Sequence, residues 1–362
     1  MPVKIIRGSK RANVYSGPIS MNQVAEHAGV SRSAVSLALK HHPSIPATTR
    51  ERIRAAAQEL GYRPNPLVTA LMRSRRTSSH ASTVRASLGF LTADAPTDHW
   101  RDATTHRNFY AAATTRAAER GFSLEEFSAS DPKMRPERLM ELLQARGIHG
   151  ILVAPLTGHE NTLPFNLNRF SIVGLGTSVQ VPEIDRVADD HFYAAQLAYT
   201  QAHALGYKRI GFALAADVSR RLEHRWLSGY LVAQQQQSPS TRIPVFMPKT
   251  REDIPLGLNA WIARQRVDAV IFALRDQKKM SCAPIETGLI SLSVHEDGNV
   301  AGIRQDEFRI GAEAIDLLVE KLQRWETGSP RGPRLNLVRG VWCAGQSAPG
   351  VGRRRQALLL KK

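Results

Sequence analysis

The feature that most constrains the fold is the alternation of short apolar runs with amphipathic helix patterns over residues 86–341. Strands that alternate with helices form parallel sheets, because each helix returns the chain to begin another parallel strand. The apolar runs predict strands at 86–91, 122–127, 150–154, 171–175, 209–214, 243–247, 267–273, 289–294 and 335–341. The period of 3.6 residues predicts helices at 108–120, 135–146, 191–205, 221–237, 256–264 and 308–325. A break in this alternation near residues 174–190 indicates that the strands form two sheets.

Basic residues are concentrated near the N-terminal end of the sequence. Residues 1–85 contain 14 Lys and Arg and 3 Asp and Glu, so they carry +11 of the formal net charge of +17. A strongly basic segment suits a polyanionic partner such as nucleic acid. On composition alone, a solvated basic surface is the alternative interpretation.

Three short helix patterns lie within this basic segment. Ser20 and Ser31 precede the first two as N-cap residues, and Gly29 lies in the turn between them. The third helix is expected over residues 48–60 and ends at Gly61. Two short helices joined by a glycine-containing turn are typical of a helix-turn-helix, whose second helix lies in the DNA major groove. A generic three-helix packing unit is the alternative.

Residues 19–72 resemble the DNA-binding head of the lac-repressor/galactose-repressor (LacI/GalR) family of transcriptional regulators. The matching segments are VAEHAGVS, AVSLAL, TRERI and LGYRPNP, followed by Leu71. A weaker resemblance extends over residues 88–340 and includes YKRIGF and RQD. It implies an α/β protein with an all-α helix-turn-helix head and a hinge, followed by a two-lobed periplasmic-binding-protein-like core with parallel sheets.

The resemblance and the composition divide the chain into five segments. We expect a flexible basic arm over residues 1–18 and the DNA-binding head over 19–65. A hinge helix and linker follow over 66–85, and a ligand-sensing and dimerisation core over 86–348. Residues 349–362 form a basic tail.

The resemblance also assigns DNA contacts residue by residue. Arg32, Ser33 and Leu37 fall where the family reads bases in the major groove. The positions of backbone or flanking contacts are occupied by Ser31, Ala34, Ser36, Lys40 and Asn65. Leu71 falls where the family inserts a leucine into the minor groove, which unstacks a base step and kinks the DNA. Many relatives have Arg where Leu37 stands, and Leu donates no hydrogen bond, so the operator need not match theirs.

A crevice between two lobes is suited to a small ligand. The candidate effector contacts are polar or aromatic residues near the ends of predicted strands or helices, namely Asp94, Trp100, Thr157, Arg225, Asp276 and Glu296. A carboxylate can accept from two sugar hydroxyls, and an aromatic face can stack on a pyranose. An exposed residue at a loop tip is the alternative for each of them. Two departures from the family put the sugar site in doubt: Trp226 stands where an Arg is common, and the connection after Asp276 is short.

No enzyme or metal motif is evident. The segment GLGTS at 174–178 is neither a phosphate-binding loop nor a nucleophile elbow. Asp189, Asp190 and His191 could bind a metal, but an acidic helix N-terminus is the simpler interpretation. Cys282 and Cys343 lack metal spacing and are typical of reduced thiols. Apolar runs long enough to span a membrane are missing. We expect no cofactor, metal or membrane partner.

We therefore predict a cytoplasmic, sequence-specific transcription regulator of the LacI type that acts as a repressor and is not an enzyme. A homodimer would bind a pseudo-palindromic operator in double-stranded DNA. A small-molecule effector such as a sugar would modulate the DNA affinity from the core cleft. Two alternatives remain: a DNA-binding protein whose core no longer senses a ligand, and a periplasmic-fold binding protein or enzyme merely tethered to DNA.

Overall fold

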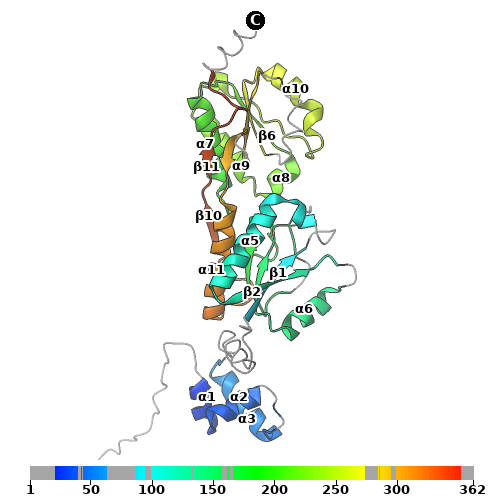
Figure 1. Ribbon diagram of the computed structural model, residues 1–362, viewed down its shortest axis with the longest axis vertical. Helices are drawn as coiled ribbons and strands as arrows, with labels where there is room; N and C mark the ends of the chain where they lie inside the picture. Colours follow the sequence, from blue (N-terminus) through cyan, green and yellow to red (C-terminus); the bar gives the residue numbers. More distant parts are fainter. Residues whose placement is uncertain are drawn as a thin grey trace, which may run out of the picture. The chain divides into compact units, whose positions relative to one another are not determined.

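The computed structural model describes residues 21–39, 42, 44–62, 86–93, 99–131, 134–156, 161–163, 166–273, 284, 286–294 and 299–351. The chain divides into two compact units, residues 1–82 and 83–362 (Figure 1). The predicted arm, the predicted hinge and most of the predicted tail lie outside the described residues. Within the described residues, no helix is both long and apolar enough to cross a membrane.

The described part of the first unit is a bundle of three helices, α1 (Met21–Ala28), α2 (Arg32–Leu39) and α3 (Ala47–Glu59). Its core is small and apolar, with Val24, Val35 and Ile53 fully buried. Gly29 ends α1 in the left-handed conformation (φ +62°), which costs glycine no steric strain. The three predicted helices are confirmed, with ends within about two residues, the usual uncertainty of helix boundaries.

The second unit begins with a parallel sheet of order β10-β5-β4-β3-β1-β2, which forms the first lobe. Its strands are β1 (Ala86–Thr92), β2 (Phe122–Ser128), β3 (Gly150–Val153), β4 (Ser171–Leu175), β5 (Asp185–Asp189) and β10 (Leu335–Val338). Helices α5 (Thr104–Glu119) and α11 (Glu307–Arg324) lie side by side on one face (Figure 1). Helix α6 (Pro136–Ala145) packs Leu139 and Leu143 on the other. A short 3-10 helix, η1 (His99–Asp102), precedes α5.

The second lobe contains a five-stranded sheet of order β11-β9-β8-β7-β6, in which only β11 is antiparallel. Its strands are β6 (Ile210–Ala213), β7 (Ala269–Phe272), β8 (Gly288–Ser291), β9 (Ala301–Arg304) and β11 (Val341–Cys343). The helices are α7 (His191–Ala204), α8 (Ala216–Arg221), α9 (Arg225–Gln235), α10 (Ile254–Gln265) and the 3-10 helix η2 (Pro239–Thr241). Phe212 of β6 stacks on Tyr230 of α9, whereas Trp261 of α10 covers the neighbouring Gly211 from the opposite face.

The chain passes between the lobes three times, from β5 to α7, from β9 to α11 and from β10 to β11. Side chains at these connections therefore lie where the two lobes meet. Two parallel sheets linked by repeated crossings are the architecture of a periplasmic-binding-protein-like core. The predicted fold class is confirmed for the described residues.

Several predicted elements need correction. Residues 243–247 form no strand, because only Phe246 makes a bridge, to Ala213. The helix expected over 221–237 is α9, which begins only at Arg225, because Glu223 and His224 adopt the left-handed conformation (φ 52° and 56°) and separate it from the unpredicted α8. That conformation is strained for residues with a side chain. The strand expected over 335–341 is two strands, β10 and β11, which belong to different sheets.

Two strands, β5 and β9, were not predicted. β5 has the sequence DRVAD, which contains three charged residues and gives no apolar run. Its Asp185 is nevertheless buried, because the Lys321 ammonium of α11 donates to its carboxylate. The break that the sequence placed near residues 174–190 therefore contains a further strand of the first sheet, and the chain crosses to the second lobe after it.

Candidate DNA interface and effector cavity

The exposed face of α2 carries the residues predicted to contact DNA. Arg32 and Ser33 are exposed, and Ser36 and Leu37 are partly exposed, on the side opposite the buried Val35. This arrangement leaves a guanidinium and two hydroxyls available to base edges and phosphates.

The Ser31 hydroxyl sets the start of this helix. It accepts a hydrogen bond from the backbone N–H of Ala34 (3.2 Å), so the predicted N-cap is confirmed, and it lies 2.9 Å from the Ser33 hydroxyl. Ala34 is partly exposed. None of α1, α2 and α3 has an acidic residue in its first turn, which leaves their positive ends compatible with phosphate. Lys40, Asn65 and Leu71, also predicted to contact DNA, lie outside the described residues.

A cavity of about 280 Å³ lies within the second unit between its two lobes. From the first lobe, it is lined by Thr105, His106, Phe109, Pro155, Leu156, Gly176, Thr177, Ser178 and Asp189. From the second lobe and the crossing between β9 and α11, it is lined by His191, Val218, Arg221, Leu222, Trp226, Arg251, Ala273, Ser293 and Gln305. Several of these residues directly follow β3, β4, β7, β8 or β9. Carboxyl ends of parallel strands are the usual location of a ligand site in such folds.

The cavity wall contains buried polar atoms that have no hydrogen-bond partner among the described residues. They are Thr177 Oγ1, Asp189 Oδ1, His191 Nδ1, Trp226 Nε1 and Arg251 Nε. Nearly all buried polar groups in proteins are hydrogen-bonded, since an unpaired one costs about 1–3 kcal/mol. Such atoms around one cavity are satisfied by water or by a polar ligand.

The turn after β4 is fixed by two kinds of hydrogen bond. Arg186 Nη1 donates to the carbonyl oxygens of Thr177 (3.0 Å) and Val179 (3.2 Å), while the Ser178 hydroxyl accepts from the Leu156 N–H (2.7 Å). Gly176 begins this turn with φ +72°. The turn thus holds the Thr177 hydroxyl in the cavity wall, whereas the Ser178 hydroxyl is occupied by its hydrogen bond with the Leu156 N–H.

The crossing from β5 to α7 supplies both Asp189 and His191. Between them, Asp190 accepts from the Tyr193 N–H (3.0 Å) and caps α7, as the acidic-cap interpretation predicted. The His191 ring lies edge-on to Trp226, with 4.5 Å between ring centroids. In the described part of the chain, no group of three or more His, Cys, Asp or Glu side chains could hold a metal ion.

Burial shifts the pKa of both titratable groups toward their neutral forms. The pKa of Asp189 is raised to about 8 by burial, then by the Glu307 and Asp306 carboxylates. Burial, with a smaller contribution from the Arg225 charge, lowers the pKa of His191 to about 3. With Asp189 and His191 neutral, the permanently charged side chains among the described lining residues are those of Arg221 and Arg251.

Replacing Asp189 with Asn should raise the melting temperature by an amount that increases with pH. Because the pKa of Asp189 is about 4 when unfolded and about 8 when folded, ionisation destabilises the folded protein progressively between these values. The gain of Asp189→Asn over the parent should grow from pH 5 to pH 8 and level off above. Thermal unfolding followed by circular dichroism at several pH values measures it. A gain independent of pH would contradict a buried neutral carboxyl.

The two described residues of the predicted effector set, Trp100 and Arg225, do not line this cavity. Trp100 is buried against Phe90 and Tyr110, with ring centroids 5.4 and 5.2 Å away, which leaves no free face for a pyranose. Arg225 Nε donates to Glu223 (3.0 Å), whose other oxygen accepts from Arg186 Nη1 (2.9 Å). Asp94, Thr157, Asp276 and Glu296 lie outside the described residues.

The residues that do line the cavity gave only weak signals in the sequence. Thr177 and Asp189 directly follow or end buried strands, which is the pattern that marks ligand sites in parallel sheets. Arg251 precedes α10 in a loop and has no motif around it. Their convergence depends on the crossings between the lobes, which the local sequence does not encode.

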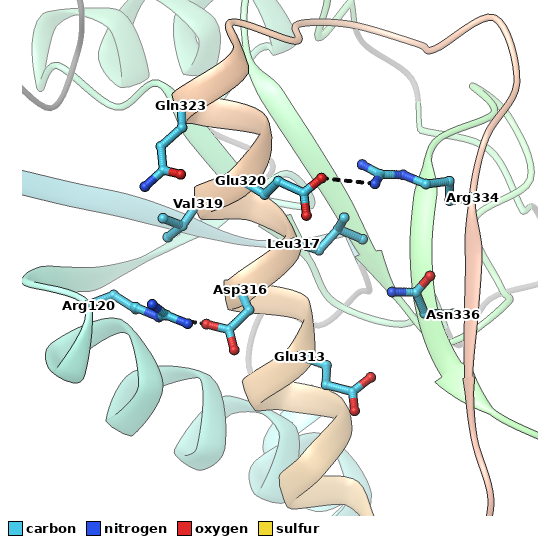
Figure 2. A pocket seen from close by; sticks show the side chains of 9 residues that line it. All are labelled: Arg120, Glu313, Asp316, Leu317, Val319, Glu320, Gln323, Arg334 and Asn336. Carbon is cyan, nitrogen blue, oxygen red and sulfur yellow. Dashed lines mark hydrogen bonds and ion pairs between the residues drawn. The ribbon is translucent and has the colours of Figure 1, made fainter.

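A second concavity, along α11, has a different chemistry (Figure 2). It measures about 390 Å³ and is lined by Arg120, Glu313, Asp316, Leu317, Val319, Glu320, Gln323, Arg334 and Asn336. Its charges neutralise one another, because Arg120 pairs with Asp316 (2.7 Å) and Arg334 with Glu320 (3.1 Å). With its main charges already paired, this groove is a weaker ligand site than the cavity between the lobes.

Comparison with known proteins agrees with this geometry. The family model described as "Bacterial regulatory proteins, lacI family" matches residues 20–65, which include α1, α2 and α3. The transcriptional repressor PurR of Haemophilus influenzae is 23% identical over 352 residues, covering 88% of this chain and 96% of PurR. The match identifies residues 20–65 as a DNA-binding domain of the lacI type. The full-length similarity to PurR agrees with a transcriptional regulator.

Three further proteins show how far the similarity extends. The regulator PtxS of Pseudomonas plecoglossicida is 28% identical over 198 residues, but the match spans only about half of either protein (53% of this chain, 52% of PtxS). Among solved structures, the CelR–cellobiose complex has a TM-score of 0.53 at 18% identity and covers 91% of this chain and 100% of that one. The lac repressor dimer bound to operator and an anti-inducer has a TM-score of 0.52 at 18% identity, covering 92% and 100%. These structures share the fold.

Proposed function

We propose that this protein is a ligand-controlled repressor of the LacI family. Residues 19–65 bind half of a pseudo-palindromic operator. Residues 66–85 connect this DNA-binding head to the core, and residues 86–348 form the core, which dimerises and holds a small-molecule effector. The names of two similar proteins support this proposal, since PurR is a repressor and the lac repressor binds its operator as a dimer. A two-fold symmetric dimer matches a palindromic site.

The observation that carries the proposal is the cavity whose wall is shared by both lobes. Asp189 comes from the first lobe, whereas Trp226 and Arg251 come from the second, and all three present unpaired polar atoms. A ligand that bonds to both lobes stabilises one arrangement of them over others, which is what an effector requires. The unpaired atoms favour this function over a core that has lost its ligand site.

In the proposed complex, α2 lies in the major groove. Arg32, Ser33 and Leu37 read base edges, while Ser31, Ala34, Ser36, Lys40 and Asn65 contact the backbone or flanking positions. Leu71 enters the minor groove at the centre of the operator. Of the base readers, Arg32 is the one that can donate two parallel hydrogen bonds, which suits a guanine edge.

Replacing Arg32 with Ala tests the proposal. Genomic DNA fragments retained by the protein would be sequenced, and the affinity for the recovered sites measured with each variant. Arg32→Ala should cost about 1–3 kcal/mol and relax the preference at one base pair in each half-site. Arg52→Ala on α3 is the matched control, because Arg52 is equally exposed and its loss removes the same charge. The control should leave sequence preference unchanged.

Two results would count against the proposal. Retention of fragments with no shared palindromic sequence would contradict operator recognition. Equal weakening of all sites by Arg32→Ala would assign Arg32 to phosphate contact instead of base reading.

A further inference from the structure

We propose that the effector of this protein is a compact anion, a metabolite bearing a carboxylate or phosphate group that Arg251 binds in the cavity between the lobes. This inference rests on the proposed function and narrows its ligand class, because the sequence suggested a neutral sugar. It follows from the charge, the hydrogen-bonding types and the size of the cavity.

Charge is the first argument. The described lining contains two guanidinium groups, Arg221 and Arg251, and a single acidic residue, Asp189. Burial keeps Asp189 protonated at neutral pH, since its pKa is raised to about 8. The described wall therefore carries a net positive charge, which disfavours a cation and favours an anion.

The surroundings of Arg251 leave its side chain for a ligand. The nearest acid in the sequence, Asp253, accepts from the N–H (3.1 Å) and the hydroxyl (2.9 Å) of Thr250. Arg251 Nε is buried and bonds to no described residue, nor does Arg251 form an ion pair with a described carboxylate. Arg251 as a whole is partly exposed, but a buried Nε–H without an acceptor is costly, and an acceptor on an anionic ligand would relieve this cost.

The loop that carries Arg251 is fixed to the second lobe. The N–H of Ala216, at the start of α8, donates to the Pro248 carbonyl (2.8 Å), and the Asp217 N–H to the Lys249 carbonyl (3.4 Å). Arg251 therefore lies beside the α8 residues that also line the cavity. A guanidinium on an anchored loop is better placed to bind a ligand than one on an unattached loop.

Hydrogen-bonding types give the second argument. The indole N–H of Trp226 and the Nε–H of Arg251 can only donate. The Thr177 hydroxyl, the neutral His191 ring and the protonated Asp189 carboxyl can each donate too. No ionised carboxylate in the described wall could accept from the several hydroxyls of a neutral sugar. The two obligate donors, Trp226 and Arg251, favour a ligand with acceptor oxygens, as carboxylate and phosphate groups provide, while Thr177, His191 and Asp189 can either donate or accept.

The size of the cavity limits the ligand. Its volume of about 280 Å³ lies at the lower end of the range of roughly 300–1,000 Å³ for ligand pockets. A monosaccharide acid or monosaccharide phosphate is of suitable size. A dinucleotide is too large.

Thermal shift on the full-length protein tests the ligand class. The probes are charged and neutral sugars of matched ring structure: glucuronate with glucose, galacturonate with galactose, and glucose 6-phosphate with the same glucose. A bacterial small-molecule extract, separated by ion exchange into an anionic and a neutral fraction, covers ligands outside these pairs. We expect the anionic fraction to raise the melting temperature and the neutral fraction to have no effect. Carboxylate and phosphate probes distinguish the two sources of charge.

Three variants locate the anion. Arg251→Gln removes the charge and should weaken binding of the stabilising anion about 10- to 100-fold, the usual effect of losing a hydrogen bond to a charged group. Arg251→Lys keeps the charge and should retain more of the affinity. Arg220→Gln is the matched control, because Arg220 is exposed on α8, next to Arg221, and does not line the cavity. The melting temperatures without ligand show that each variant is folded.

The outcomes distinguish the anionic ligand class from the ligand-controlled function. Stabilisation by the neutral fraction alone would overturn the anion while leaving a ligand-controlled regulator intact. Stabilisation by neither fraction would reject both the anion and the ligand-controlled function. An anion that binds Arg251→Gln as tightly as the parent would show that it is held elsewhere.

Discussion

The affinity of this protein for DNA should fall about 10³- to 10⁵-fold when salt is raised from 50 to 200 mM, as expected for a protein that contacts roughly 6–10 phosphates. The physical cause is counterion release. Each phosphate that Lys or Arg neutralises releases cations condensed on the DNA, and a higher salt concentration makes this release less favourable. The segment 1–85 carries +11 of the net charge of +17, so it supplies most of this term. Fluorescence anisotropy of a labelled duplex across the salt range gives the slope directly.

Deletion of residues 1–72 is the control for the salt experiment. The deletion removes the helices α1 to α3 with their separate apolar core, whereas the second unit keeps its own buried clusters. DNA binding should be abolished while the remaining chain stays folded. A flat salt response of the full chain, or DNA binding by the truncated chain, would contradict a phosphate-dominated contact through the head.

Lys321→Met should destabilise the second unit by about 3–5 kcal/mol, because it leaves a buried carboxylate without its partner. Lys321 on α11 and Asp185 on β5 form an ion pair, and both side chains are about 1–2% exposed. Asp185 also accepts from the Arg334 backbone N–H (2.7 Å), and the Arg334 guanidinium lies 3.7 Å from its carboxylate. Arg334 is 40% exposed, so these contacts compensate only part of the cost of so deeply buried a charge. Urea-induced unfolding followed by circular dichroism measures the loss.

The double variant Lys321→Met with Asp185→Asn distinguishes an uncompensated charge from lost packing. Asn keeps an oxygen for the Arg334 N–H and carries no charge. If the cost arises from the charge, the double variant should be clearly more stable than Lys321→Met alone. A loss below about 1 kcal/mol in the single variant, or no recovery in the double variant, would contradict a structural role for this pair.

The same ion pair shows why β5 could not be predicted. A strand is recognised in sequence by its apolar residues, and the segment Asp185–Asp189 begins and ends with a carboxylate. What makes the segment suitable for burial is an ammonium 136 positions further along the chain. By contrast, β4 (Ser171–Leu175) is mostly apolar, is fully buried and was predicted with its observed ends.

The helical head, unlike β5, could be predicted from the sequence. Its Ser31 cap, its Gly29 turn and its Val35 core position act within a few residues of one another. Local interactions of this kind are visible in a single sequence. The family resemblance of residues 19–72 and the charge of residues 1–85 pointed to DNA for the same reason, since both are properties of a continuous segment.

The effector cavity depended on the tertiary structure. Sequence position suggested Trp100 and Arg225, but the first is buried by Phe90 and Tyr110 and the second is paired with Glu223. The cavity is instead built from Thr177, Asp189, His191, Trp226 and Arg251, which segments of both lobes bring together. The sequence by itself thus determined the helical head and most strands and helices, because these follow from local periodicity, capping and charge. Only the folded chain decided which polar groups are buried without partners, because that depends on contacts between residues far apart in the sequence.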